Sequence, residues 1–123
     1  MPLEGLIILL VEDEPLIALD IAQTLRGAGA DVRGPLPSLA AAHRYMDAPP
    51  GDIRVDAVVL DYQLVDGNTE ALARSLTASA IPFVWHTANS ELVRPLAEEM
   101  KIKVVSKPAA ERDLLDALGA VVR

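Results

Sequence analysis

Five polar side chains lie at or just beyond the ends of short apolar runs, and their chemical types could bind and accept a phosphoryl group. They are three carboxylates, one hydroxyl and one ammonium group: Glu12, Asp13, Asp61, Thr87 and Lys107. Three carboxylates brought together repel one another, and a hard divalent cation with oxygen ligands, such as Mg²⁺, relieves that repulsion. A carboxylate can act as a nucleophile on phosphorus, while a cation and a hydroxyl can hold phosphoryl oxygens. The set therefore predicts Mg²⁺-assisted phosphoryl capture on Asp61.

The apolar runs themselves predict the strands that must position these groups. A continuous apolar run ending in charged residues is typical of a strand buried on both faces of a parallel sheet. We predict strands at residues 6–11, 57–60, 82–85 and 103–105, and a weaker pattern places a short second strand at 31–34. Phe83 and Trp85 alternate within the run 82–85 and are expected in the core.

Helical patterns lie between the predicted strands. We expect helices at residues 15–28, 39–47, 69–78 and 110–122. Pro15 suits the first position of the first helix, and Ser38 is the expected N-cap of the second. The first helix is expected to turn an apolar face inward, formed by Leu16, Ile17, Leu19, Ile21 and Leu25.

The segment after the fourth strand is less regular in sequence. Asn89 or Ser90 could cap a fourth helix, but Pro95 follows shortly after. Proline removes a helical hydrogen bond and clashes with the preceding turn, so we expect this helix to be short or irregular. A separate loop is expected at Pro49-Pro50-Gly51.

The alternation of strands and helices predicts an α/β fold with a doubly wound parallel sheet. Ligands of such folds bind outside the carboxyl ends of the strands. Four of the five predicted strands end beside at least one of these five side chains. The sequence therefore predicts one site at one edge of the sheet.

Length and composition exclude several classes of protein. The chain has 123 residues, a net charge of −7, 51% hydrophobic residues and no cysteine. These values fit a single domain at 1–123, and the absence of cysteine excludes thiolate metal sites.

We see no apolar run of the roughly 20 residues that span a bilayer and no signal peptide. The acidic balance argues against direct nucleic-acid binding. We expect a cytoplasmic protein that binds no membrane.

Four motifs together resemble the receiver domain of two-component response regulators, and the resemblance covers essentially the whole chain. They are LIILLVEDEP, VVLDYQLVDG, FVWHTA and VVSKP. The resemblance implies the flavodoxin-like (βα)5 fold with strand order 2-1-3-4-5. It also implies a signalling domain, not an enzyme, which accepts a phosphoryl group from a histidine kinase or a histidine phosphotransfer protein.

The resemblance also implies a role for each site residue. Asp61 would be the phosphoacceptor. Asp13, Asp61 and the backbone carbonyl of Gln63 would ligate Mg²⁺, with Glu12 acting mostly through water. Thr87 and Lys107 would hold the phosphoryl oxygens, and Thr87 would relay the change to the face of helix four, strand five and helix five. Neighbours expected to tune the site are Gln63, Ala88, Asn89 and Pro108.

Besides Pro95 in the expected fourth helix, the chain departs from the receiver pattern at two places. Only Tyr62 to Val65 separate Asp61 from the Asp66-Gly67 turn, which is short for a receiver. Val104 stands where an aromatic switch residue is usual. The short loop and FVWHTA resemble stand-alone receivers of the FATGUY type, which often work beside HWE-type kinases, although the glycine and tyrosine of that motif are missing.

Each site residue also has a purely structural interpretation. Acidic residues are favoured at a helix N-terminus, Asp61 could begin a turn, Thr87 could cap a loop, and Lys107 could be an ordinary surface lysine. His86 is expected to be packed within its strand, and His43 to lie on a solvated helix face. Gln63 and Asn89 are as readily inert loop residues as tuning residues.

Two other functions remain open at this stage. A haloacid-dehalogenase-like phosphatase uses similar residues, but it places the nucleophile on its first strand and its metal acids after the lysine. A receiver-like module could also bind partners without phosphorylation. No output domain is seen, and the chain could act alone or be part of something longer. The kinase, the downstream protein and the choice between a monomer and a phosphorylation-dependent dimer stay undetermined.

Overall fold

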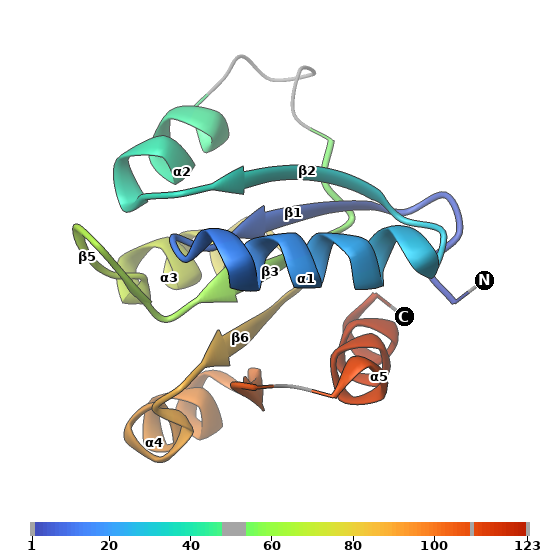
Figure 1. The fold of residues 1–123 in the computed structure, drawn as a ribbon. Helices are drawn as coiled ribbons and strands as arrows, with labels where there is room; N and C mark the ends of the chain where they lie inside the picture. Colours follow the sequence, from blue (N-terminus) through green and yellow to red (C-terminus); the bar gives the residue numbers. More distant parts are fainter. Residues whose placement is uncertain (1, 48–53, 109, 123) are drawn as a thin grey trace.

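The computed structural model describes residues 2–47, 54–108 and 110–122. Its main sheet has five parallel strands in the order β2-β1-β3-β6-β7. These are the first to fifth strands of that sheet along the chain, so the predicted order 2-1-3-4-5 is confirmed. Figure 1 shows helices on both faces of the sheet, as the doubly wound fold requires. The loop expected at Pro49-Pro50-Gly51 lies outside the described residues.

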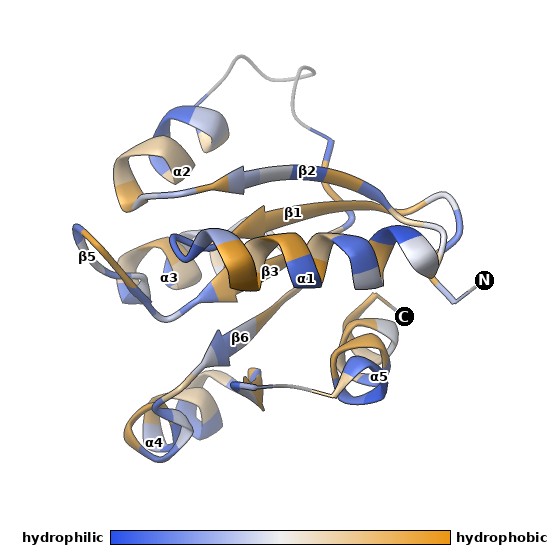
Figure 2. Ribbon diagram, in the orientation of Figure 1, coloured by the Kyte–Doolittle hydropathy of each residue, from blue (hydrophilic) through white to orange (hydrophobic). Residues whose placement is uncertain are grey.

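The five strands match the predicted apolar runs, with small shifts at their ends. They are β1 (Ile7–Val11), β2 (Asp31–Leu36), β3 (Ala57–Asp61), β6 (Phe83–Thr87) and β7 (Lys103–Ser106). Every residue of β3 and β6 is buried, because these central strands are covered on both faces. β2 lies at the edge and is two residues longer than the predicted 31–34. Figure 2 shows apolar colour along β1 and hydrophilic colour at the arrowhead of β6.

Five helices pack on the sheet in two layers. They are α1 (Pro15–Gly27), α2 (Leu39–Met46), α3 (Glu70–Ala78), α4 (Ser90–Met100) and α5 (Glu111–Val121). One core joins α1 and α5 to the sheet through residues such as Leu10, Leu25 and Leu118. The second core joins α2, α3 and α4 to the opposite face through residues such as Leu9 and Leu76. Leu9 and Leu10 belong to different cores because successive strand side chains point to opposite faces.

The expectation of a short or irregular fourth helix is wrong. α4 runs without interruption from Ser90 to Met100, with Pro95 inside it. Pro95 lies one turn into the helix, so the hydrogen bond that it removes is the one to the carbonyl of Glu91. Glu91 and Pro95 are both exposed, and water can therefore bind that carbonyl. The opposite side of α4 buries Val93 and Ala97, which holds the helix on the sheet.

The predicted apolar face of α1 is also partly wrong. Ile21 and Leu25 are buried with Ala18 and Ala22, whereas Leu16 is 75% exposed and Leu19 is 53% exposed. Ala18, Ile21, Ala22 and Leu25 follow the i, i+3, i+4, i+7 spacing of one helix face, and Leu16 and Leu19 fall outside that face. Leu16 and Leu19 therefore face away from the core.

The segment after β3, expected to be a simple loop and turn, contains a small antiparallel hairpin. Its strands are β4 (Gln63–Leu64) and β5 (Gly67–Asn68). The Asp66 carboxylate at its tip accepts hydrogen bonds from the N–H groups of Leu39 and Ala40, at 2.7 and 3.0 Å. The expected N-cap Ser38 is confirmed, since its hydroxyl accepts the N–H of Ala41 at 3.1 Å. The hairpin and Ser38 together cap α2.

Within the described residues, no helix has the length and apolar character needed to cross a membrane.

Candidate functional site

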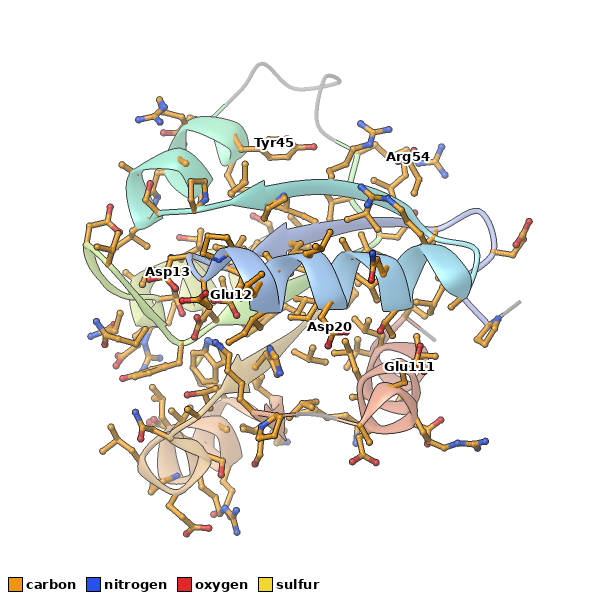
Figure 3. The ribbon with its side chains drawn as sticks, viewed as in Figure 1. Glu12, Asp13, Asp20, Tyr45, Arg54 and Glu111 are labelled. Carbon is orange, nitrogen blue, oxygen red and sulfur yellow. The ribbon has the colours of Figure 1, made fainter. Side chains whose placement is uncertain are left out.

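The carboxyl ends of four parallel strands bring the predicted site residues to one edge of the sheet. Glu12 and Asp13 follow β1, Asp61 is the last residue of β3, Thr87 is the last of β6, and Lys107 follows β7. Glu12 and Asp61 are buried, and Asp13 is partly exposed. Figure 3 shows Glu12 and Asp13 together at the end of β1, just before α1. Parallel pairing alone therefore assembles the set.

Lys107 is held between two carboxylates. Its Nζ lies 2.7 Å from Glu12 Oε1 and 2.9 Å from Asp61 Oδ2. The Lys107 side chain is 13% exposed, and the two carboxylates are still more buried. The other oxygen of Glu12 accepts the N–H of Glu14 at 3.2 Å. Charge-assisted contacts at these distances fix Glu12 and Asp61 on one cation.

The same edge has a donor set that fits a divalent cation. Glu12, Asp13 and Asp61 each offer a carboxylate oxygen, and these oxygens all lie within 4.8 Å of one another. Lys107 supplies one positive charge against three carboxylates, so the cluster keeps an excess of negative charge. Oxygen ligands with a partly open side suit Mg²⁺, which usually keeps several of its waters. Asp13 is the more accessible of the three, and it opens the cluster to solvent.

The electrostatics of the cluster raise the pKa of Asp61 into the neutral range. Burial, with the neighbouring Glu12 carboxylate, raises the pKa of Asp61 to about 7, and Lys107 only partly opposes this. Burial raises the pKa of Glu12, but the neighbouring Asp61 and the Lys107 charge outweigh this effect, and the net result is a lowered pKa. A bound divalent cation would favour the charged carboxylates instead. Binding of a divalent cation would therefore displace a proton from Asp61 at pH values below about 7.

Thr87 is placed at the site, but its hydroxyl is turned to its own loop. Thr87 is buried, and its Oγ1 accepts the backbone N–H of Asn89 at 3.0 Å. The backbone N–H of Lys107 donates to the Thr87 carbonyl at 2.9 Å, which ties the two loops together. Asn89 occupies the N-cap position of α4 without a side-chain capping bond.

The other predicted site residues lie around this centre. The N–H of Gln63 donates to Asp61 Oδ1 at 3.3 Å, while its side-chain amide donates to the Leu64 carbonyl. Ala88 and Pro108 line a groove of about 490 Å³ between α1 and α5, which Lys107 also borders. Val104 on β7 is partly buried and packs against the second core.

His86 is packed inside its strand, as the sequence leads us to expect. It is 3% exposed, and neither ring nitrogen has a hydrogen-bond partner among the described residues. Burial, together with the nearby Lys107 charge, lowers the pKa of His86 to about 4. His86 is therefore neutral at physiological pH. His43 is exposed on α2, which also agrees with expectation.

Sequence reasoning missed a second layer of polar residues behind Asp61. The Thr69 hydroxyl donates to the Asp61 carbonyl oxygen at 2.7 Å and accepts the Trp85 Nε1–H at 3.2 Å. The sequence pattern predicts Thr69 only as the first residue of the helix at 69–78. One signal was present in the sequence: a buried tryptophan requires a hydrogen-bond acceptor for its indole N–H.

Comparison with known proteins supports the receiver fold. No protein-family model and no curated protein matches the chain. Among solved structures, the chain is similar to the non-phosphorylated HemR receiver domain from Leptospira biflexa, with 26% identity, a TM-score of 0.80 and coverage of 96% of this chain and 94% of that one. A response regulator receiver protein from Burkholderia phymatum gives 25% identity, a TM-score of 0.80 and coverage of 96% and 95%.

A third similar structure contains a metal ion. It is the receiver domain of a sensor histidine kinase from Pseudomonas aeruginosa, with a magnesium ion coordinated in its active-site cleft. Identity is 24%, the TM-score is 0.78, and 96% of this chain and 98% of that one are covered. The resemblance to receiver domains is thus confirmed: the chain has the CheY-like receiver fold, with an acidic cluster at the expected edge of the sheet. The FATGUY subtype stays a prediction.

Proposed function

We propose that this chain is a phosphorylation-controlled receiver, in which Asp61 accepts a phosphoryl group from a phosphohistidine. The donor would be a histidine kinase, with the HWE type as one candidate, or a histidine phosphotransfer protein. One observation carries the proposal: a buried carboxylate, a lysine and two further acids converge at one edge of a receiver fold. Such a protein would act as a cytoplasmic signalling domain and not as an enzyme with a separate substrate.

In the proposed reaction an Asp61 carboxylate oxygen attacks the phosphorus of the donor. A P–O bond to Asp61 forms while the P–N bond of the phosphohistidine breaks, and its electron pair leaves with the donor's imidazole, which takes up a proton from water. Lys107, now paired with Asp61 and Glu12, balances the charge on the phosphoryl oxygens. Thr87 contributes its hydroxyl once that group releases the N–H of Asn89.

The proposed cofactor is Mg²⁺, and the residues present fit it. Glu12, Asp13 and Asp61 supply carboxylate oxygens, and the Gln63 carbonyl is the proposed further ligand. When bound, Mg²⁺ would offset the negative charge of these acids and of the incoming phosphoryl group. The magnesium ion in the Pseudomonas aeruginosa receiver structure supports this assignment. Asp13 and Asp61 are proposed as direct ligands and Glu12 as a ligand through water.

The proposed output is a change in partner binding at the face formed by α4, β7 and α5. A phosphoryl group adds roughly −1.5 to −2 charges, and movement of Thr87 toward it would disturb the loop that leads into α4. The backbone N–H of Lys107 donates to the Thr87 carbonyl, so the loops that follow β6 and β7 are coupled at the site. The favoured conformation would then bind a downstream protein with changed affinity.

Intact-mass analysis tests the proposal directly. The wild type, Asp61→Asn and the control Asp116→Asn, an exposed change on α5, are incubated with Mg²⁺ and acetyl phosphate. We expect the wild type and the control to gain one phosphoryl mass and Asp61→Asn to gain none. The same experiment is repeated with phosphorylated candidate kinases. If the wild type stays unmodified with every donor, the phosphorylation-independent binding module becomes the better interpretation.

A further inference from the structure

We infer that Thr69 is a positioning residue for the phosphoacceptor, acting through the backbone of Asp61. This inference rests on the proposed function of Asp61. The Thr69 side chain is fully buried. Its hydroxyl lies 2.7 Å from the Asp61 carbonyl oxygen and 3.2 Å from the Tyr62 carbonyl oxygen. Thr69 thus contacts the phosphoacceptor's own peptide group without touching the carboxylate.

The Thr69 hydroxyl has no role in capping α3. Thr69 occupies the N-cap position, where a hydroxyl normally accepts a helix N–H, but its side chain makes no such bond. The Asn68 side chain accepts the N–H of Glu70 at 3.0 Å instead. The hydroxyl of Thr69 is therefore turned away from its own helix and toward the end of β3.

Both hydrogen-bonding functions of this hydroxyl are used by neighbouring segments. It donates to the Asp61 carbonyl and accepts the indole N–H of Trp85 at 3.2 Å. Trp85 is itself fully buried and lies on β6, two residues before Thr87. Because the Trp85 donor limits rotation of the hydroxyl, the Thr69 hydrogen points toward the carbonyl oxygens of Asp61 and Tyr62. Two successive hydrogen bonds, from Trp85 to Thr69 and from Thr69 to Asp61, therefore connect β6 to the end of β3.

The peptide group of the Asp61 carbonyl determines the direction in which the loop after β3 leaves the sheet. Asp61 is the last residue of β3, and beyond it the Gln63 N–H contacts Asp61 Oδ1 at 3.3 Å. The backbone N–H of Thr69 also donates to the Tyr62 carbonyl at 2.8 Å. Fixing the peptides of Asp61 and Tyr62 fixes both the Asp61 carboxylate and the Gln63 carbonyl. Reaction rates fall steeply when reacting groups are misplaced by even about 1 Å.

Three substitutions separate positioning from simple stability. Thr69→Val keeps the shape and removes the hydroxyl, Thr69→Ser keeps the hydroxyl, and Thr77→Val is the control for loss of a threonine hydroxyl away from the site. Thr77 is an exposed residue of α3, and among the described residues its hydroxyl bonds the Ala73 carbonyl alone, at 3.1 Å. All variants are measured at a temperature where circular dichroism shows them folded, and emission from Trp85, the sole tryptophan, checks that the indole stays buried.

The first readout is the rate of phosphoryl gain from acetyl phosphate with Mg²⁺, followed by intact mass. We expect Thr69→Val to react at least about tenfold more slowly than the wild type, and Thr69→Ser and Thr77→Val to react at close to the wild-type rate. Equal rates for the two valine variants would overturn the inference. Should Thr69→Val not fold, Thr69→Ala is measured in its place, since it removes the same hydroxyl and leaves room for a water molecule.

The second readout is Mg²⁺ affinity by calorimetry, which does not depend on phosphoryl transfer. Thr69→Val is expected to bind Mg²⁺ more weakly than Thr69→Ser, because the Gln63 carbonyl and the Asp61 carboxylate lose their common support. If the wild type accepts no phosphoryl group, the proposed function fails, and this comparison alone decides whether Thr69 positions the acidic cluster. Equal Mg²⁺ affinities would then count against the inference.

Discussion

Lys107 and Asp61 are 46 residues apart in the chain, yet Lys107 Nζ donates to Asp61 Oδ2 at 2.9 Å. The same nitrogen lies 2.7 Å from Glu12 Oε1. A single cation therefore joins the ends of β1, β3 and β7 across the edge of the sheet. Because Lys107 already contacts the proposed phosphoacceptor, its charge needs little movement to reach an incoming phosphoryl oxygen.

Removing this charge should slow phosphoryl transfer. Lys107→Met keeps the length of the side chain but leaves Glu12 and Asp61 without their cation. We expect phosphoryl gain from acetyl phosphate to fall by about 10²-fold or more, the usual cost of losing one charged or hydrogen-bonding group at a transition state. The control is Lys103→Met on β7, where the lysine is exposed. Equal rates for the two variants would remove Lys107 from the proposed mechanism.

Mg²⁺ binding should release a proton in acid solution but not in alkaline solution. The pKa of Asp61 is raised to about 7 in the metal-free protein, so at pH 6 most molecules carry a proton there that the cation must displace. At pH 8 Asp61 is already ionised. Calorimetric Mg²⁺ titrations in buffers of different ionisation enthalpy measure the release. We expect close to one proton at pH 6 and close to none at pH 8; the same number at both would contradict the assignment of Asp61 as a ligand.

The fold and the centre of the site could be predicted because they depend on features local to each strand. Continuous apolar runs identify buried strands, and the parallel arrangement brings their carboxyl ends to one edge. Asp61 and Lys107 meet for this reason alone. No detailed knowledge of the loops is needed to bring them together.

The remaining features depend on contacts that a single sequence does not display. Thr69 looks like a helix-starting residue, and only the path of the β4–β5 hairpin turns its hydroxyl toward Asp61. Leu16 fits an apolar helical pattern, but the way α1 lies on the sheet leaves it 75% exposed. Pro95 suggests a broken helix, whereas tertiary packing of Val93 and Ala97 keeps α4 continuous. In each case packing outweighs a local preference.

Buried His86 should reduce stability as the pH falls. The pKa of His86 is about 4 in the folded protein against an ordinary value of 6.5, so below pH 6.5 the unfolded chain binds a proton that the folded chain does not. Linkage then removes about 2 kcal/mol of unfolding free energy between pH 7.5 and pH 5. Asp61 acts in the opposite sense, because its raised pKa makes the folded protein the better proton binder between about pH 4 and pH 7. The wild-type stability can therefore look flat over this range.

Comparing variants isolates the His86 contribution from that of Asp61. Urea unfolding of the wild type and His86→Leu at pH 7.5 and pH 5 is the measurement, and the Asp61 contribution cancels in the difference. On going from pH 7.5 to pH 5, we expect the unfolding free energy of His86→Leu to rise by about 2 kcal/mol relative to that of the wild type. His43→Leu, an exposed change on α2, is the control. If the difference in unfolding free energy between wild type and His86→Leu is the same at both pH values, His86 has the same pKa in the folded and unfolded chains, and the prediction is wrong.

Val104 should direct the response to phosphorylation toward α4. Val104 pairs with Trp85 in the sheet and is partly buried. Because valine is small, this position has no large side chain that could change its orientation together with Thr87. The Thr87 hydroxyl, in contrast, bonds the N–H of Asn89 directly before α4. Amide hydrogen exchange with and without phosphorylation should change most in residues 88–100 and little in β7. In Val104→Tyr the changes should extend into β7 and α5, where the larger ring must be accommodated. If the wild type already responds mainly in β7, the signal passes through that strand without an aromatic residue, and Val104 does not determine its direction.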